Sequence, residues 1–128
     1  MRSLDASYCF DLLRGDEFAR QRSIDWETQG ERLTIAAPAL AEFLRAGHRR
    51  GGRLLERSTA LARRLEVLPL DGPSAEEAAR MGGECDRRGV AVANSDLMIA
   101  AVVRLHRGIL VTRDHDFARI PGLQIETY

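Results

Sequence analysis

Four acidic residues stand at positions where strands are expected to end or helices to begin. They are Asp5 in RSLDAS, Glu42 in APALAEFLRAG, Asp96 in NSDLMIAAVV and Asp114 in ILVTRDHDF. A carboxylate placed among apolar residues is costly unless something offsets its charge. Four such placements in one chain of 128 residues indicate a shared cation, and ligands that are all oxygen favour Mg²⁺ or Mn²⁺. The pattern is typical of a metal-dependent enzyme.

The chemistry of such a site follows from its charge. If the four carboxylates converge, each raises the pKa of the others, and a divalent cation relieves the repulsion. The same cation lowers the pKa of water and offsets negative charge on a phosphodiester, which is the chemistry of a nuclease. Taken singly, Asp96 and Asp114 are better explained as acids that favour a helix N-terminus, an effect of about 0.3 to 1 kcal/mol. Convergence of all four is therefore the hypothesis that the fold must support.

The apolar pattern predicts strands that alternate with helices. The expected strands are residues 2–5, 33–36, 66–70, 109–112 and 123–126. This alternation implies right-handed crossovers and a mainly parallel, roughly five-stranded sheet in a three-layer α/β/α sandwich. Asp5 and Asp114 would then lie at the carboxyl edge of the sheet, where open α/β sheets place their sites. Glu42 and Asp96 join them if the first and fourth strands are neighbours.

Local signals predict where several helices begin. Ser7 is a candidate N-cap of the first helix, and Ser74 with Glu77 three residues later has the spacing of a capping box. Asn94 or Ser95 is expected to cap the helix that carries Asp96. A second, weakly amphipathic helix from residue 16 to about 29 contains Trp26. We expect this residue to make packing or dimer contacts, and it is also a candidate anchor for a partner.

The basic residues are unevenly distributed. All 19 are Arg, balanced by 19 acids, so the whole chain is neutral. Residues 45–64, interrupted by a predicted break at 47–52, hold seven arginines and a single acid, Glu56. Such a run is either a solvated helix face or a phosphate-binding surface, because the guanidinium fork matches phosphate geometry. The candidates for binding RNA or a partner are Arg45, Arg49, Arg50 and Arg53.

Other classes of protein fit the sequence poorly. No window is apolar enough for a membrane span, and Cys9 and Cys85 are too few for a disulfide framework, so we expect a cytoplasmic protein without membrane contact. One domain over residues 1–128 suits the length. A receiver-like signalling domain would also hold Mg²⁺ on acids, but it needs a lysine and this chain has none.

Three segments resemble the PIN-domain ribonucleases, in particular the VapC-type toxins of toxin–antitoxin pairs. They are LDASYCFDLLRG, APALAEFLRA and SDLMIAAVVRLHRGILVTRDHDFARIPGL. The last is the most specific, because an acid-led apolar helix, a Gly, an apolar strand and T-x-D-x-x-F follow in order. Ala6, Tyr8 and Cys9 depart from the residues usual after the first acid.

The resemblance implies a PIN fold, Mg²⁺- or Mn²⁺-dependent cleavage of RNA, a homodimer and inhibition by a cognate antitoxin. The four acids match the family's catalytic, metal-binding set. Asp116 is a further acid near it, while Ser7 and Thr112 match polar positions that would orient carboxylates or water. An alternative keeps the fold without strong catalysis: a PIN-fold binding protein that acts in a promoter-DNA-binding complex with the antitoxin.

Overall fold

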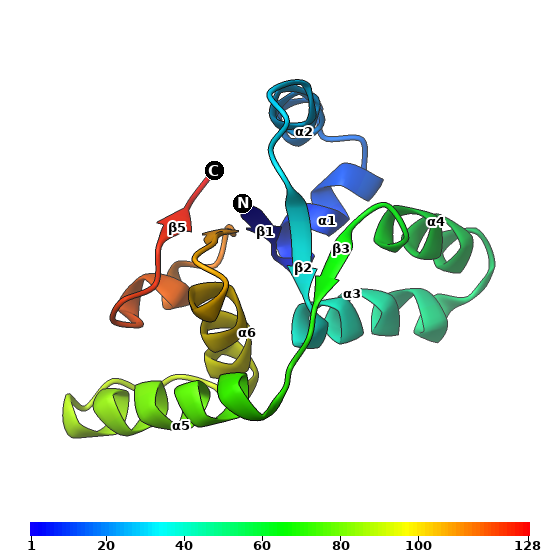
Figure 1. The fold of residues 1–128 in the computed structure, drawn as a ribbon. Coiled ribbons are helices and arrows are strands. Elements are labelled where there is room, and N and C mark those ends of the chain that lie inside the picture. The colour runs from blue at the N-terminus through cyan, green and yellow to red at the C-terminus, as the bar shows by residue number, and fades with distance from the viewer.

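A five-stranded sheet organises the computed structural model, which describes all 128 residues (Figure 1). The strands are β1 (Arg2–Leu4), β2 (Leu33–Ala36), β3 (Glu66–Leu68), β4 (Ile109–Val111) and β5 (Ile125–Glu126). Their order across the sheet is β3-β2-β1-β4-β5, and every neighbouring pair is parallel. The predicted sheet is confirmed, although β3 and β5 are shorter than expected.

Six α-helices and one 3₁₀ helix complete the three-layer α/β/α sandwich. They are α1 (Ala6–Leu13), α2 (Glu17–Thr28), α3 (Ala37–Arg50), α4 (Gly52–Ala62), α5 (Gly72–Arg87), α6 (Asn94–Leu105) and η1 (His115–Arg119). Helix α3 packs against α4, and α5 against α6 (Figure 1). No helix combines the length and the apolar character that a membrane crossing requires.

Strand β1 lies at the centre of the sheet, where the strand order reverses. Ser3 pairs with Thr34 of β2 on one side and with Leu110 of β4 on the other. The Asp5 backbone N–H donates to the Val111 carbonyl at 3.0 Å and so extends the β1–β4 pairing by one residue. The carboxyl ends of β1 and β4 are therefore adjacent, as the proposed convergence of the acids requires.

The core follows from strands that are covered on both faces. Ile35, Leu110 and Val111 are fully buried, as the continuous apolar runs of a parallel sheet predict. Helix α6 buries half of its twelve residues, including the uninterrupted run from Ile99 to Val103. Since Asp96 stands in its first turn, this burial fixes the acid at the edge of the sheet.

Helix α1 begins earlier than the sequence predicts. Its first residue is Ala6, its N-cap is Asp5, and Ser7 lies inside the helix. The Asp5 side chain makes no capping bond, because its Oδ2 accepts hydrogen bonds from the hydroxyls of Thr112 and Ser7. The prediction that Ser7 caps the helix was wrong because this hydroxyl serves the carboxylate instead.

Two further helix starts also differ from the prediction. The capping box of α5 joins Asp71 to Ser74, because Gly72 and Pro73 already form the first turn, where proline's missing N–H costs nothing. Glu77 instead forms ion pairs with Arg80 and Arg104. Helix α6 has Ala93 at its N-cap, so neither Asn94 nor Ser95 caps it.

The predicted break at 47–52 shrinks to Gly51 and Gly52. Helix α3 continues through Gly47 to Arg50, and Gly51 has a φ of 68°, which ends the helix. Gly47 is buried against α4: a Cβ there would stand 3.1 Å from the Ser58 Oγ and 3.3 Å from the Leu55 Cα. Its role is close helix packing rather than a turn.

Trp26 is a packing residue, as expected, and is not available as a surface anchor. It is 5% exposed and packs beside Tyr8, with ring centroids 5.7 Å apart. The guanidiniums of Arg2 and Arg22 lie over the Trp26 ring, at 5.0 Å and 5.1 Å from its centroid. The exposed apolar residues of α2 are instead Phe18 and Ile24.

The capping box gives a direct stability test. Ser74→Ala should lower the free energy of unfolding by about 1 kcal/mol, because the buried hydroxyl satisfies the backbone N–H of Asp71. Ser95→Ala, in the first turn of α6 without a capping bond, is the matched control and should leave stability unchanged. Urea unfolding of both variants measures the difference, and equal losses would contradict the assigned box.

Candidate active site

Asp5 is the most buried of the four acids. It is 5% exposed and lies directly after β1, at the N-terminus of α1. Its Oδ2 accepts from the Thr112 Oγ1 at 2.8 Å and from the Ser7 Oγ at 3.3 Å. Burial raises the pKa of Asp5 above its ordinary value of 3.8, while these two hydrogen bonds act in the opposite direction. The charge of Asp114 adds to the rise.

The segment after β4 forms one side of the site. Thr112 is fully buried, donates to Asp5, and accepts at its Oγ1 from the Asp114 backbone N–H at 3.0 Å. Asp114 caps η1, its Oδ1 accepting from the Asp116 N–H at 2.9 Å. Asp116 is exposed and lies 3.5 Å from the Arg119 guanidinium. The Thr112 hydroxyl therefore connects Asp5 to the loop that carries Asp114.

Glu42 and Asp96 approach from two helices. Glu42 is exposed in the second turn of α3, and Asp96 is half-buried in the first turn of α6. Partial burial raises the pKa of Glu42, and the charges of Asp5, Asp96 and Asp114 raise it further. Burial likewise raises the pKa of Asp96, followed by the charges of Asp114, Asp5 and Asp116. The predicted acids thus lie close enough to act on one another electrostatically.

None of the four acids has a cationic partner within the protein. Twelve salt bridges tie arginines to other acids and one ties the N-terminus to Glu31, and none involves Asp5, Glu42, Asp96 or Asp114. The chain has 19 arginines, yet none of them pairs with these four acids. The edge of the sheet therefore carries a concentrated negative charge that the protein itself does not neutralise.

The donor set suits a hard divalent ion, with one restriction. All the side chains are carboxylates or hydroxyls, the ligands that Mg²⁺ and Mn²⁺ prefer. No three acidic, His or Cys side chains stand close enough together to enclose an ion on their own. Mg²⁺ in proteins commonly keeps several waters and uses only one or two carboxylates, so the arrangement fits a partly hydrated ion.

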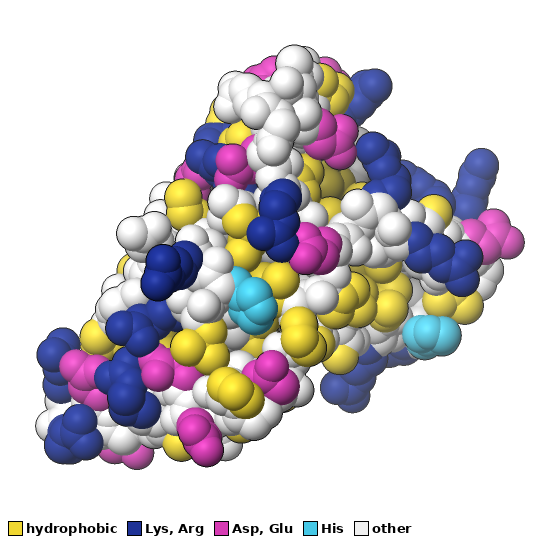
Figure 2. Space-filling view, in the orientation of Figure 1, with side chains coloured by type: hydrophobic (Ala, Val, Ile, Leu, Met, Phe, Trp, Pro, Cys, Tyr) yellow, Lys and Arg dark blue, Asp and Glu magenta, His cyan; other side chains and the backbone are white.

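The arginine-rich stretch forms the far end of α3 and α4. Figure 2 shows dark-blue side chains gathered there with little magenta among them, whereas charges of both signs mix along α5. Arg45, Arg49, Arg50 and Arg53 are exposed and have no ion pair or side-chain hydrogen bond. Arg45 follows Glu42 by one helical turn, so this surface continues directly from the acidic site.

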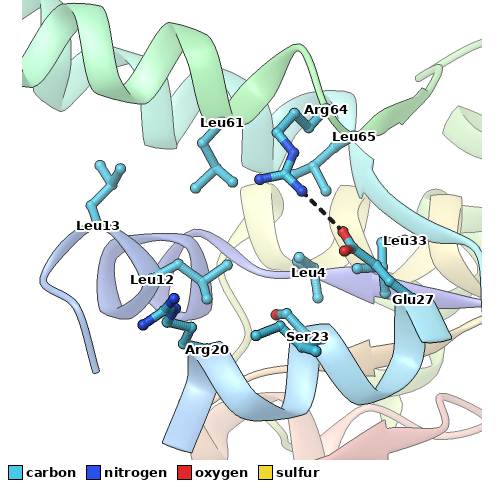
Figure 3. A pocket seen from close by; sticks show the side chains of 11 residues that line it. Leu4, Leu12, Leu13, Arg20, Ser23, Glu27, Leu33, Leu61, Arg64 and Leu65 are labelled. Atoms are coloured by element: carbon cyan, nitrogen blue, oxygen red, sulfur yellow. Dashed lines mark hydrogen bonds and ion pairs between the residues drawn. The ribbon is translucent and has the colours of Figure 1, made fainter. Parts of the chain in front are cut away.

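A separate apolar groove opens between α1, α2 and α4 (Figure 3). It has a volume of about 370 Å³. Its apolar lining is Leu4, Leu12, Leu13, Ile24, Leu33, Leu61 and Leu65. Arg20 lies at the rim, as do Arg64 and Glu27, whose side chains are 3.4 Å apart. None of the four candidate site acids lines the groove, so groove and acidic site are different features.

Sequence reasoning missed this groove and one buried acid. The groove's leucines pack against the core and are buried or partly buried, and only the three-dimensional arrangement shows that a groove stays open between them. Asp11, on α1, is 4% exposed and bonds to Tyr128 and Arg113. An acid within the apolar run CFDLL was the available signal for it.

Comparison with known proteins agrees with this geometry. The chain matches the PIN domain over residues 3–123, and it belongs to the PIN-domain family. Among curated proteins, no sequence match is found.

Solved structures share the whole fold. VapBC2 from Rickettsia felis, bound to a DNA fragment from its promoter, contains a chain with TM-score 0.86 at 21% identity, covering 99% of this chain and 98% of that one. A chain of DNA-bound VapBC from Salmonella typhimurium has a TM-score of 0.82 at 29% identity, covering 98% of this chain and 96% of that one. VapBC-1 from nontypeable Haemophilus influenzae gives 0.80 at 20% identity, also covering 98% and 96%. The predicted likeness to chains of VapBC toxin–antitoxin systems is therefore confirmed.

The unneutralised acids have a measurable consequence for stability. Because the folded-state pKa of Asp96 is raised, the folded protein binds protons more tightly, and stability is lost as the pH rises through that pKa. Asp96→Asn should therefore raise the melting temperature of metal-free protein at pH 8 by about 2 to 5 °C, with little gain near pH 4.

Asp25→Asn, an exposed change on α2 that keeps the contact with Gln21, is the matched control. It should leave the melting temperature unchanged at pH 8 and at pH 4. Differential scanning calorimetry in chelator measures both variants. A gain for Asp96→Asn that does not depend on pH would contradict the assigned repulsion.

Proposed function

We propose that the protein is a metal-dependent endoribonuclease toxin that hydrolyses RNA phosphodiester bonds and is held inactive by a cognate antitoxin. The observation that carries the proposal is the unpaired acid set at the carboxyl ends of β1 and β4, in a chain rich in arginine. Membership of the PIN family supports nuclease chemistry, since PIN domains of VapC toxins are generally nucleases.

Each acid has a distinct place in the proposed site. Asp5, oriented by the Thr112 and Ser7 hydroxyls, is the fixed ligand, because burial and hydrogen bonds leave it little freedom. Asp96 and Asp114 would complete the metal site, and Glu42 would hold water on its exposed side. Bound Mg²⁺ or Mn²⁺ would lower the pKa of a water molecule and offset negative charge on the phosphate. Asp116, in the first turn of η1, would add its negative charge next to these metal-binding acids.

The exposed arginines of α3 and α4 provide the RNA contact. Arg49 lies seven residues beyond Glu42, about 10 Å along the helix axis. An RNA strand whose scissile phosphate reaches the acidic site would therefore place its neighbouring phosphates beside Arg45 and Arg49. Since the chain as a whole is neutral, this local surface must supply most of the electrostatic attraction.

The groove between α1, α2 and α4 is the proposed antitoxin site. Apolar floors between helices accept the apolar face of an amphipathic helix. The rim arginines Arg20 and Arg64 favour acidic residues on the edge of that helix. The related structures are VapBC complexes, and two of those described above are bound to DNA, so a complex with an antitoxin is also the assembly expected here.

The proposed homodimer would use a different surface. Leu70 and Met98 are 39% and 37% exposed and line a second groove against α5, whose wall is made of Ala and Gly residues. A second copy of the chain would cover these side chains and leave both the acidic site and the first groove open.

Cleavage of RNA tests the function directly. Purified protein free of antitoxin should cleave RNA with Mn²⁺ or Mg²⁺ and lose the activity in chelator. Asp5→Asn and Asp96→Asn should each lower the rate by about 100-fold or more, since removing one group that stabilises developing charge costs about that factor. Circular dichroism should show both variants folded.

The alternative, a weakly catalytic binding protein in a promoter-DNA complex, predicts the opposite outcome. Antitoxin-free protein would then show no metal-dependent cleavage, and Asp5→Asn would behave as wild type.

Partner binding tests the groove. Leu61→Glu should weaken antitoxin binding at least tenfold, because it places a carboxylate on the apolar lining. Ala60→Glu, exposed on the adjacent face of α4, is the control and should bind normally. Isothermal titration calorimetry with the cognate antitoxin measures both, and equal affinities would place the antitoxin elsewhere.

A further inference from the structure

A second polar cluster lies behind the acidic loop. The Asp11 carboxylate is 4% exposed, and its Oδ2 accepts from the Tyr128 hydroxyl at 2.8 Å. Its Oδ1 lies 3.1 Å from the Arg113 Nη2 and also accepts a hydrogen bond from the Nη1 of the exposed Arg14, at 3.2 Å. Asp11, Arg113 and Tyr128 come from α1, from the segment after β4 and from the segment after β5. A buried carboxylate is tolerated only with such partners, so Asp11, Tyr128 and Arg113 form one built unit, with Arg14 at its exposed edge.

This unit holds Arg113, which lies between two residues of the proposed site, Thr112 and Asp114. Arg113 follows Thr112, which donates to Asp5, and precedes Asp114. Its backbone N–H donates to the Ser7 Oγ at 3.4 Å, and Ser7 in turn donates to Asp5. Arg113 is therefore fixed at its side chain by Asp11 and at its backbone by a hydroxyl that touches the central acid.

Tyr128 is fixed by packing as well as by its hydrogen bond. Its ring meets Tyr8 edge-on, at 5.0 Å between centroids and 83° between planes, and the Arg113 guanidinium lies 6.0 Å from the ring centre. Burial raises the pKa of Tyr128, and the bond to Asp11 raises it further. The phenol is therefore protonated at neutral pH and acts as a donor to Asp11.

The pairing of Arg113 also matters for charge. This arginine is adjacent in sequence to Asp114, and a free guanidinium there would find carboxylates within reach. Engaged by Asp11, it makes no ion pair with Asp114 or Asp116. The negative charge at the edge of the sheet is thereby kept available for a cation.

We propose that Asp11 and Tyr128 are positioning residues that act through Arg113. They hold the loop from Thr112 to Asp116 in its metal-binding arrangement and keep the Arg113 guanidinium away from the carboxylates. The proposal rests on the proposed function, because it concerns the same acids, but it assigns a role to side chains that touch neither metal nor RNA.

Removal of a single hydroxyl tests the proposal. Tyr128→Phe keeps the ring and loses the bond to Asp11, and Asp11→Asn weakens the hold on Arg113. Each should lower Mn²⁺ affinity about tenfold, the usual cost of disturbing a group that orients a metal ligand. Each should also speed hydrogen exchange of the Asp114 and Asp116 amides, whose acceptors belong to the loop.

Tyr8→Phe is the matched control. It removes a neighbouring phenol hydroxyl that donates to the Ala19 carbonyl at 2.6 Å, away from the loop. This variant should lose thermal stability while Mn²⁺ affinity and exchange of the loop amides stay at wild-type values. Electron paramagnetic resonance titration measures the Mn²⁺ affinities. Hydrogen exchange followed by NMR measures how well the loop amides are protected.

The outcomes separate this proposal from the proposed function. Wild-type Mn²⁺ affinity and loop exchange in Tyr128→Phe would overturn the positioning role, as would equal effects of Tyr8→Phe. If wild-type protein neither binds Mn²⁺ nor cleaves RNA, the proposed function fails, and the exchange data alone decide whether the cluster holds the loop. If Asp11→Asn does not fold, Tyr128→Phe decides the question.

Discussion

The parallel pairing of β1 with β4 is the interaction on which the site depends. Strand order reverses at this pair, so Asp5 after one strand meets Thr112 and Asp114 after the other. The bond from the Asp5 N–H to Val111 fixes the register at the point where the site begins. A slip of one residue would turn the Thr112 hydroxyl to the opposite face of the sheet and break its contact with Asp5. Fold and chemistry are joined at this single place.

The second constraint is electrostatic. Burial and mutual repulsion raise the pKa values of Asp5, Glu42 and Asp96, and no arginine relieves them. Such a site costs stability in the absence of a cation, which is characteristic of groups arranged for function rather than for folding. Ser7, Thr112 and the Asp11 cluster supply the hydrogen bonds and ion pairs that hold the acids in place despite this cost.

Much of this was predictable from the sequence, and the failures have physical causes. Strand alternation gave the sheet, and four acids at element ends gave the candidate site, because both signals are local. Helix starts at Ser7, Ser74 and Ser95 were misplaced because hydroxyls can serve several acceptors, and tertiary contacts decide which. The groove was not predicted because it depends on which helices pack together, and a propensity pattern does not specify that.

The central claim, that the edge of the sheet holds a divalent ion, is tested most directly by anomalous diffraction from crystals soaked in Mn²⁺. The account predicts a manganese peak beside the Asp5 carboxylate, within reach of Asp96 or Asp114, that disappears in Asp5→Asn crystals. A map without such a peak, or an arginine side chain paired with Asp5 in its place, would contradict it.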